Sequence, residues 1–123
     1  KIIEMQIKKT GKLFSFCCVA PAIISNKNEK ILKFFENLGY DIGLLFQITD
    51  DLIDFKGLTK KAGKKTKKDE KKGKATLIGL LGYKNTIKYI DIIKNNIIKK
   101  INYYGKKSKY IKETIMFIYE RDK

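Results

Sequence analysis

The sequence contains no histidine, and its two cysteines, Cys17 and Cys18, are adjacent. Without histidine the protein lacks the commonest general base of enzymes and the commonest nitrogen ligand of zinc. Adjacent cysteines cannot form an ordinary disulfide with each other, and we expect both to be small buried apolar residues in a reducing compartment. These absences argue against histidine-dependent chemistry and predict a cytoplasmic protein.

Long hydrophobic runs are also absent. No stretch reaches the roughly eighteen uninterrupted apolar residues of a membrane-spanning helix. The longest uncharged run, residues 13–26, contains Pro21 together with serine and asparagine. We therefore expect no membrane partner and see no signal peptide. A chain of 123 residues that begins with Lys1 rather than Met is expected to be a fragment or a processed product, holding one domain or part of one.

Acidic residues are scarce beside basic ones, which gives a formal net charge of +15. A nucleic-acid partner is the first interpretation of such a charge. However, all of the 28 basic residues except Arg121 are lysines, and isoleucine is also abundant. Both residues have A/T-rich codons, and proteins that read bases usually need arginine for bidentate contacts. We therefore expect no nucleic-acid partner, although the charge would attract anionic substrates.

Apolar residues recur at helical spacing along most of the chain, and no alternating strand pattern is present. The spacing predicts helices over 1–24 with a kink at Pro21, over 29–55, over 77–81, from Asn85 or Thr86 to Tyr104, and from Ser108 to the C-terminus. Residues 56–74 are rich in lysine and glycine and predict a mobile loop.

Two local signals refine this picture. Asn26 followed three residues later by Glu29 resembles a capping box at the start of the second helix. Gly39 and Gly43 lie four residues apart, on one face of that helix. We expect them to let a neighbouring helix approach closely.

Three carboxylates crowd the end of this apolar helix. Asp50 and Asp54 lie one turn apart on the same face, Asp51 lies beside them, and Gln47 shares their edge. Like charges this close repel one another unless cations lie between them, and Mg²⁺ prefers carboxylate oxygens together with substrate phosphates. The alternative is a solvated acidic helix end without a ligand.

The flanking residues decide between these interpretations. The string from Gly43 to Asp54 has the form Gly-x-x-Phe-Gln-x-x-Asp-Asp-x-x-Asp. Further motifs stand on both sides of it: Lys9-Thr10-Gly11 upstream, then Gly63-Lys64, Asp69 and Gly73-Lys74-Ala75-Thr76 downstream. Together with the ending from Ile118 to Lys123, this combination resembles the trans-polyprenyl diphosphate synthases of the short-chain farnesyl and geranylgeranyl type. Lys67 and Ile78 depart mildly from the family pattern, which usually has glycine and proline there.

The resemblance covers the whole chain and implies an all-α, isoprenoid synthase-type helical bundle. It implies that residues 1–123 form the C-terminal half of a single polyprenyl synthase domain. The N-terminal half, with the family's first aspartate-rich motif, would be missing. We therefore expect this chain alone to be inactive.

The implied activity is a prenyltransferase that condenses an allylic diphosphate with isopentenyl diphosphate. Its product would be a short-chain polyprenyl (farnesyl or geranylgeranyl) diphosphate. The resemblance further implies three Mg²⁺ ions in the complete site and a homodimer. Product chain length is set near the missing first motif in this family, so this half does not reveal it.

The resemblance also assigns roles to individual residues. The implied metal ligands are Asp50, Asp51, Asp54 and, through water, Asp69. The implied catalytic residues are Lys9, Thr10, Gln47 and Lys64. The implied substrate-binding residues are Lys9, Thr10, Phe46, Gln47, Lys64 and Lys74, of which the lysines would bind the leaving diphosphate.

Two alternatives stay open from the sequence. The chain could be a non-catalytic subunit that pairs with an active synthase, although a silent subunit would not need all three aspartates and the paired lysines. It could also be a basic helical nucleic-acid-binding module, whose binding would weaken steeply with salt and ignore Mg²⁺. Arg121 has no assigned role, and an interaction with the dipole of the last helix is the simplest interpretation.

Overall fold

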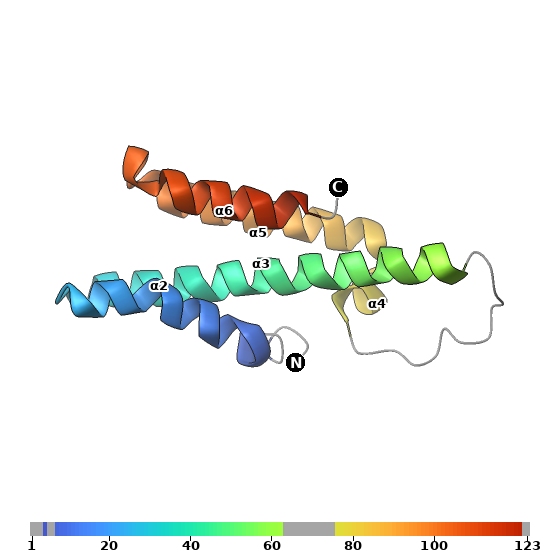
Figure 1. Cartoon of the computed structure of the whole chain (residues 1–123), viewed down its shortest axis with the longest axis horizontal. Coiled ribbons are helices and arrows are strands. Elements are labelled where there is room, and N and C mark those ends of the chain that lie inside the picture. The colour runs from blue at the N-terminus through green and yellow to red at the C-terminus, as the bar shows by residue number, and fades with distance from the viewer. Residues whose placement is uncertain (1–3, 5–6, 63–75, 122–123) are drawn as a thin grey trace.

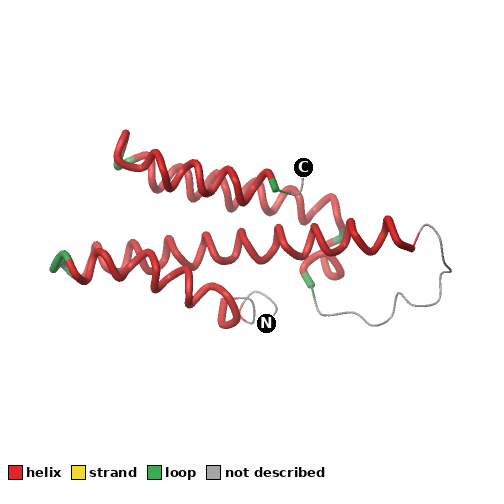
Figure 2. The backbone as a smooth tube through the Cα atoms, viewed as in Figure 1, coloured by secondary structure: helices red, strands yellow, loops and turns green. Residues whose placement is uncertain are grey.

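The computed structural model describes residue 4 and residues 7–62 and 76–121, and all regular secondary structure among them is helical (Figure 2). The predicted all-α class is therefore confirmed. The elements in chain order are the π-helix η1 (Ile7–Gly11), α2 (Lys12–Ile24), α3 (Glu29–Ala62), α4 (Leu77–Leu81), α5 (Tyr83–Asn102), the 3₁₀-helix η2 (Gly105–Ser108) and α6 (Lys109–Glu120).

Helix α3 is the central element of the bundle. Figure 1 shows α2 along one side of α3, and α5 with α6 along the other. The α3 residues Leu38, Leu45 and Ile48 are fully buried. They pack in one core cluster with isoleucines of α5 and α6, among them Ile97 and Ile115. Burial on several sides explains the wide apolar stripe of α3, and it gives the acidic residues near position 50 a rigid support.

The two glycines of α3 allow α2 to approach closely, as expected. A Cβ atom added to Gly39 would collide with the backbone of Ser15 and would lie 2.5 Å from the carbonyl oxygen of Phe14. A Cβ atom added to Gly43 would lie 2.7 Å from the Cα of Gly11. The contact at Gly43 places η1 against α3 one helical turn before Gln47.

The structure corrects the start of the expected mobile loop. Helix α3 continues past Phe55 to Ala62, so residues 56–62 are helical rather than part of a loop. Lysine is a good helix former, and lysines near a helix C-terminus interact favourably with its dipole. The single glycine in this segment, Gly57, weakens the helix without ending it. The rest of the expected loop, residues 63–74, lies outside the described residues.

The first predicted helix and its cap also differ from expectation. Within residues 1–24 the described structure is a π-helix followed by α2, with Pro21 inside α2. The prediction that Asn26 and Glu29 form a capping box is wrong. Asn26 has a φ of 50° in the turn, and it is Asn28 whose side chain accepts a hydrogen bond from the Ile31 amide at 3.0 Å.

Helix α5 begins at Tyr83, so Asn85 and Thr86 lie inside it and do not cap it. Their side chains donate to carbonyl oxygens one turn earlier, both at 2.9 Å. Ser108 does precede α6, as predicted, but its hydroxyl donates to the Gly105 carbonyl and leaves the α6 amides uncapped. None of the described helices is long and apolar enough to cross a lipid bilayer.

Candidate functional site

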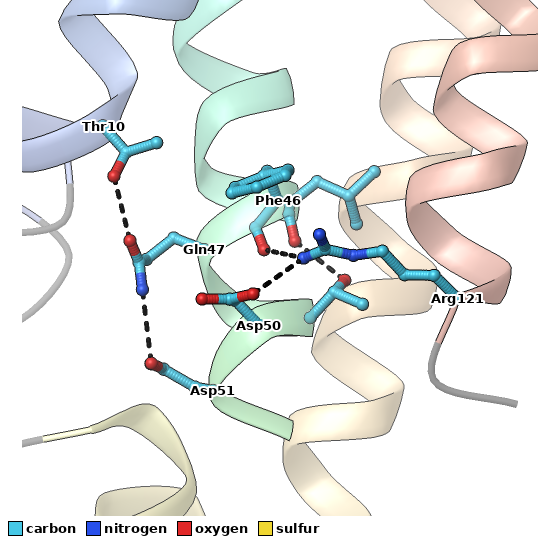
Figure 3. Close-up of polar contacts among 8 residues, drawn as sticks. Thr10, Phe46, Gln47, Asp50, Asp51 and Arg121 are labelled. Atoms are coloured by element: carbon cyan, nitrogen blue, oxygen red, sulfur yellow. Dashed lines mark hydrogen bonds and ion pairs between the residues drawn. The ribbon is translucent and has the colours of Figure 1, made fainter. Parts of the chain in front are cut away.

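Gln47 connects η1 to the acidic end of the α3 motif. The Thr10 hydroxyl donates to Oε1 of Gln47 at 2.9 Å, and Nε2 of Gln47 donates to Oδ1 of Asp51 at 3.3 Å (Figure 3). An ionised carboxylate can only accept hydrogen bonds, so the amide nitrogen must face Asp51 and the amide oxygen must face Thr10. Gln47 thereby has one orientation and holds Asp51 in place.

The short Thr10 side chain reaches Gln47 because the backbones of η1 and α3 nearly touch. Gly11 packs on Gly43, and Gly43 precedes Gln47 by one turn on the same face of α3. Residues of η1 have π-helical geometry, and such segments often occur at functional sites. The backbone of Lys9 belongs to this turn, but its side chain lies outside what the structure describes.

Asp50 has a different partner, which comes from the end of α6. Nη2 of Arg121 donates to Oδ1 of Asp50 and to the Phe46 carbonyl oxygen, both at 3.2 Å (Figure 3). The guanidinium carbon also lies 4.2 Å from the centre of the Phe46 ring, which packs in turn against Phe14. The Arg121 side chain is 21% exposed and that of Asp50 is 49% exposed. Asp50 is therefore fixed on one side and accessible to solvent.

Two of the three neighbouring aspartates thus accept hydrogen bonds from different parts of the chain. Asp50 is bound by Arg121, after α6, and Asp51 by Gln47, which is itself held by Thr10 of η1. Asp54 is exposed. Hydrogen bonds to the charged form of a carboxylate favour that form, and so they offset part of the mutual repulsion.

The donor set fits a hard divalent cation. Asp50, Asp51 and Asp54 supply only carboxylate oxygens, and Mg²⁺ prefers such ligands. Asp50 and Asp54 are both open to solvent, from which a cation would enter. Within the described ranges, no three acidic or cysteine side chains already converge on one point as a metal-binding group. The described residues can therefore offer ligands from one helix, and further ligands must come from elsewhere.

The structure brings together most of the predicted site residues that it describes. Thr10, Gln47 and Asp51 form one series of hydrogen bonds, and Arg121 joins Phe46 to Asp50. Asp54 lies one turn further along α3 than Asp50. Lys64, Asp69 and Lys74 lie outside the described residues. Sequence reasoning missed Arg121, which pairs with Asp50 rather than serving only the helix dipole. The available signal was composition, because Arg121 is the only arginine in a chain with 28 basic residues.

Comparison with protein families gives a match to the model described as Polyprenyl synthetase, over residues 1–115. A geranylgeranyl diphosphate synthase of Cyanophora paradoxa is 32% identical over 104 residues, which are 85% of this chain and 35% of that protein. A farnesyl diphosphate synthase of Bacillus subtilis (strain 168) is 33% identical over 85 residues, which are 69% of this chain and 29% of that protein.

Among solved structures, the fold is similar to that of a ligand-free FPP/GFPP synthase from Zymomonas mobilis. The TM-score is 0.78 at 32% identity, over 95% of this chain and 37% of that one. The chain therefore spans about a third of the length of the relatives that it matches. The predicted synthase-type helical bundle is confirmed over that part.

Proposed function

We propose, from the premise that the chain belongs to the polyprenyl synthetase family, that it forms part of a trans-prenyltransferase. The reaction would join an allylic diphosphate to isopentenyl diphosphate and yield a short-chain polyprenyl diphosphate. The relatives named geranylgeranyl and farnesyl diphosphate synthase support the short-chain class. The proposal includes the homodimer and the cytoplasmic location that the sequence suggested.

The chemistry of this reaction suits the residues that are present. The bond between the allylic carbon and the diphosphate oxygen breaks, and the oxygen keeps the electron pair. The electron pair of the isopentenyl double bond then forms the new carbon–carbon bond, and the resulting cation loses a proton to the departing diphosphate. The main demand on the protein is to stabilise the charge that grows on the departing diphosphate. A chain without histidine can meet that demand.

Aspartates and lysines would share this task. The proposed metal ligands are Asp50, Asp51, Asp54 and Asp69. Bound Mg²⁺ would supply the positive charge that neutralises the diphosphate oxygens. The proposed diphosphate-binding lysines are Lys9, Lys64 and Lys74. Thr10 and Gln47 would line the site beside the reacting carbons, and their hydrogen bond would keep the Gln47 amide from rotating.

The observation that carries the proposal is the way in which Asp50 and Asp51 are held. Each accepts a hydrogen bond from a side chain whose position depends on a distant part of the chain: Arg121 for Asp50, and Gln47 with Thr10 for Asp51. A solvated acidic helix end needs no such support, because exposed carboxylates are satisfied by water. Oriented carboxylates on a buried helix are what a metal-dependent diphosphate site requires.

The proposed activity also needs the remaining part of a synthase domain. The outer face of α2 exposes Leu13, Phe16, Ile23 and Ile24, which supports the view that another segment covers it. We propose that this segment carries the first aspartate-rich motif. Ligands from that side would close the metal site that the α3 aspartates form in part.

The test is reconstitution. The 123-residue chain is mixed with the complementary N-terminal part of a related synthase, and incorporation of labelled isopentenyl diphosphate is measured with geranyl diphosphate and Mg²⁺. We expect turnover in the mixture that Asp50→Ala removes without lowering the melting temperature greatly. Asp41→Ala, which removes an aspartate of α3 that lies outside the motif and pairs with Lys100, is the control. Turnover by Asp50→Ala equal to that of the unchanged chain would refute the metal assignment.

A further inference from the structure

Arg121 makes an unusual set of contacts for a residue at the end of a surface helix. Its backbone amide closes the last turn of α6 by donating to the Phe117 carbonyl. Its Nη2 bonds to both Asp50 and the Phe46 carbonyl, and its guanidinium lies over the Phe46 ring. Two of these contacts, the Phe46 carbonyl and the Phe46 ring, do not involve Asp50. The guanidinium is therefore anchored to α3 independently of the carboxylate that it binds.

The residue type fits this geometry and no other basic residue would. A guanidinium is flat, so it can stack on an aromatic ring while its in-plane nitrogens bond to oxygens at its edge. A lysine ammonium is a compact charge on a flexible stem, and it has no flat face. Every other basic residue in the chain is lysine. Within the part of the chain that the structure describes, arginine occurs where a cation stacks on a ring and also makes two hydrogen bonds.

We propose that Arg121 is a positioning residue for Asp50: anchored on Phe46, it holds Oδ1 of Asp50 and so leaves Oδ2 oriented for a divalent cation. The inference deepens the proposed function and rests on it for the identity of the cation. Among the described residues Oδ2 of Asp50 has no hydrogen-bond partner. Without Arg121, a carboxylate that is half exposed would sample several orientations, and cation binding would have to order it each time.

A second ion pair on α3 supplies the matched control. Lys100 of α5 pairs with Asp41 of α3 at 2.5 Å. Like the Arg121–Asp50 pair, it joins a carboxylate of α3 to a cation from another helix. Among the described residues, Lys100 has neither an aromatic ring beneath its ammonium group nor a second hydrogen-bond acceptor. Its loss should therefore weaken a helix–helix contact without affecting the cation site.

The experiment measures Mn²⁺ binding by calorimetry, with the 123-residue chain as it is and with Arg121→Lys and Lys100→Gln. Arg121→Lys keeps the charge and removes the stacking and the fork of donors. Loss of a group that orients a metal ligand typically weakens metal binding by 10–100-fold, so we expect about tenfold for Arg121→Lys and no change for Lys100→Gln. Binding by Arg121→Lys equal to that of the unchanged chain would overturn the proposal, even if its melting temperature fell.

A spectroscopic measurement keeps the inference separate from the proposed function. Because the chain has one arginine, ¹⁵N-arginine labelling gives a single side-chain Nε–H signal in an NMR spectrum. We expect Asp50→Asn to shift this signal and Asp54→Asn to leave it in place. If the unchanged chain bound no Mn²⁺, the α3 aspartates would be unable to hold a cation by themselves, while the shift would still decide whether Arg121 holds Asp50. If Asp50→Asn left the Arg121 Nε–H signal in place, the positioning role would be overturned.

Discussion

Gly39 of α3 lies so close to the backbone of Ser15 in α2 that a single methyl group could not fit between them. This contact, with the one between Gly43 and Gly11, sets the distance between the two helices. The same distance determines whether Thr10 can reach Gln47. The packing at Gly39 and Gly43 thus helps to fix the orientation of the Gln47 side-chain amide.

The first prediction compares two glycines of the same helix. Gly39→Ala should lower the free energy of unfolding by about 1–3 kcal/mol, because the added methyl group meets backbone atoms that cannot move away. Gly57→Ala should raise it by about 0.5–1 kcal/mol, because among the described residues no atom beyond the adjacent helix backbone lies within 4 Å of the added group, and alanine favours a helix more than glycine does. Urea unfolding followed by circular dichroism measures both, and effects of the same sign would contradict the packing.

The second prediction concerns the hydrogen bond between Thr10 and Gln47. Thr10→Val keeps the shape of the side chain and removes the donor, so the Gln47 amide oxygen loses its partner. We expect a loss of about 1 kcal/mol in the free energy of unfolding. In the reconstituted enzyme turnover should fall as well, because Gln47 no longer holds Asp51 in one orientation.

Thr10→Ser is the matched control for this change, since it retains the hydroxyl and removes only a methyl group. It should keep most of the turnover that Thr10→Val loses. If the serine and valine variants were equally impaired, the hydroxyl would have no special role at this position.

The grouping of the three aspartates was largely predictable because the residues are local in the sequence. Asp50, Asp51 and Asp54 follow one another on a single helix, and helical spacing alone places them together. Their supporting partners were less predictable. Arg121 lies 71 residues from Asp50, and its position depends on how α6 packs on α3. No periodicity in the sequence encodes that contact.

The ends of α3 were also only partly predictable from the local sequence. The C-terminal end of α3 was misplaced because a lysine-rich segment with one glycine suits a loop and a helix almost equally, and the sequence alone did not decide between them. At its N-terminal end, Asn26 and Asn28 both have side chains that can cap a helix. Asn26 has a left-handed backbone in the turn, and it is the side chain of Asn28 that caps α3.

The third prediction concerns the two cysteines. Burial raises the pKa of the Cys18 thiol, and the neighbouring Cys17 raises it further. Cys17 is exposed. Iodoacetamide should therefore modify Cys17 several-fold faster than Cys18, as measured by mass spectrometry of Cys17→Ser and Cys18→Ser variants at one pH. Equal rates would show that Cys18 is as accessible as its neighbour.

The raised pKa of Cys18 also gives a pH dependence with a definite sign. The folded chain holds the thiol proton more tightly than the unfolded chain does. This contribution to stability is fully present below the ordinary thiol pKa and is lost as the pH rises through the raised value. The melting temperature of the unchanged chain should fall over that alkaline range more than that of Cys18→Ser. An identical fall in both would assign the effect to other groups.

The last prediction concerns the behaviour of the chain by itself. Leu13, Phe16 and Ile24 are 66%, 64% and 82% exposed and recur at helical spacing on α2. No charged residue lies between them in the sequence. We expect the isolated chain to self-associate through this face and to have no prenyltransferase activity, as judged by light scattering after size-exclusion chromatography and by the condensation assay.

Replacing the apolar side chains tests which face is responsible. Phe16→Glu with Ile24→Glu should give a monomer. These changes lower the net positive charge, so a loss of association could not be due to stronger repulsion between copies. Tyr103→Glu with Tyr110→Glu changes the charge equally at residues that are 88% and 78% exposed elsewhere, and it should leave association intact. Association that survives the α2 changes, or a monomeric and active unchanged chain, would show that the α2 face needs no cover.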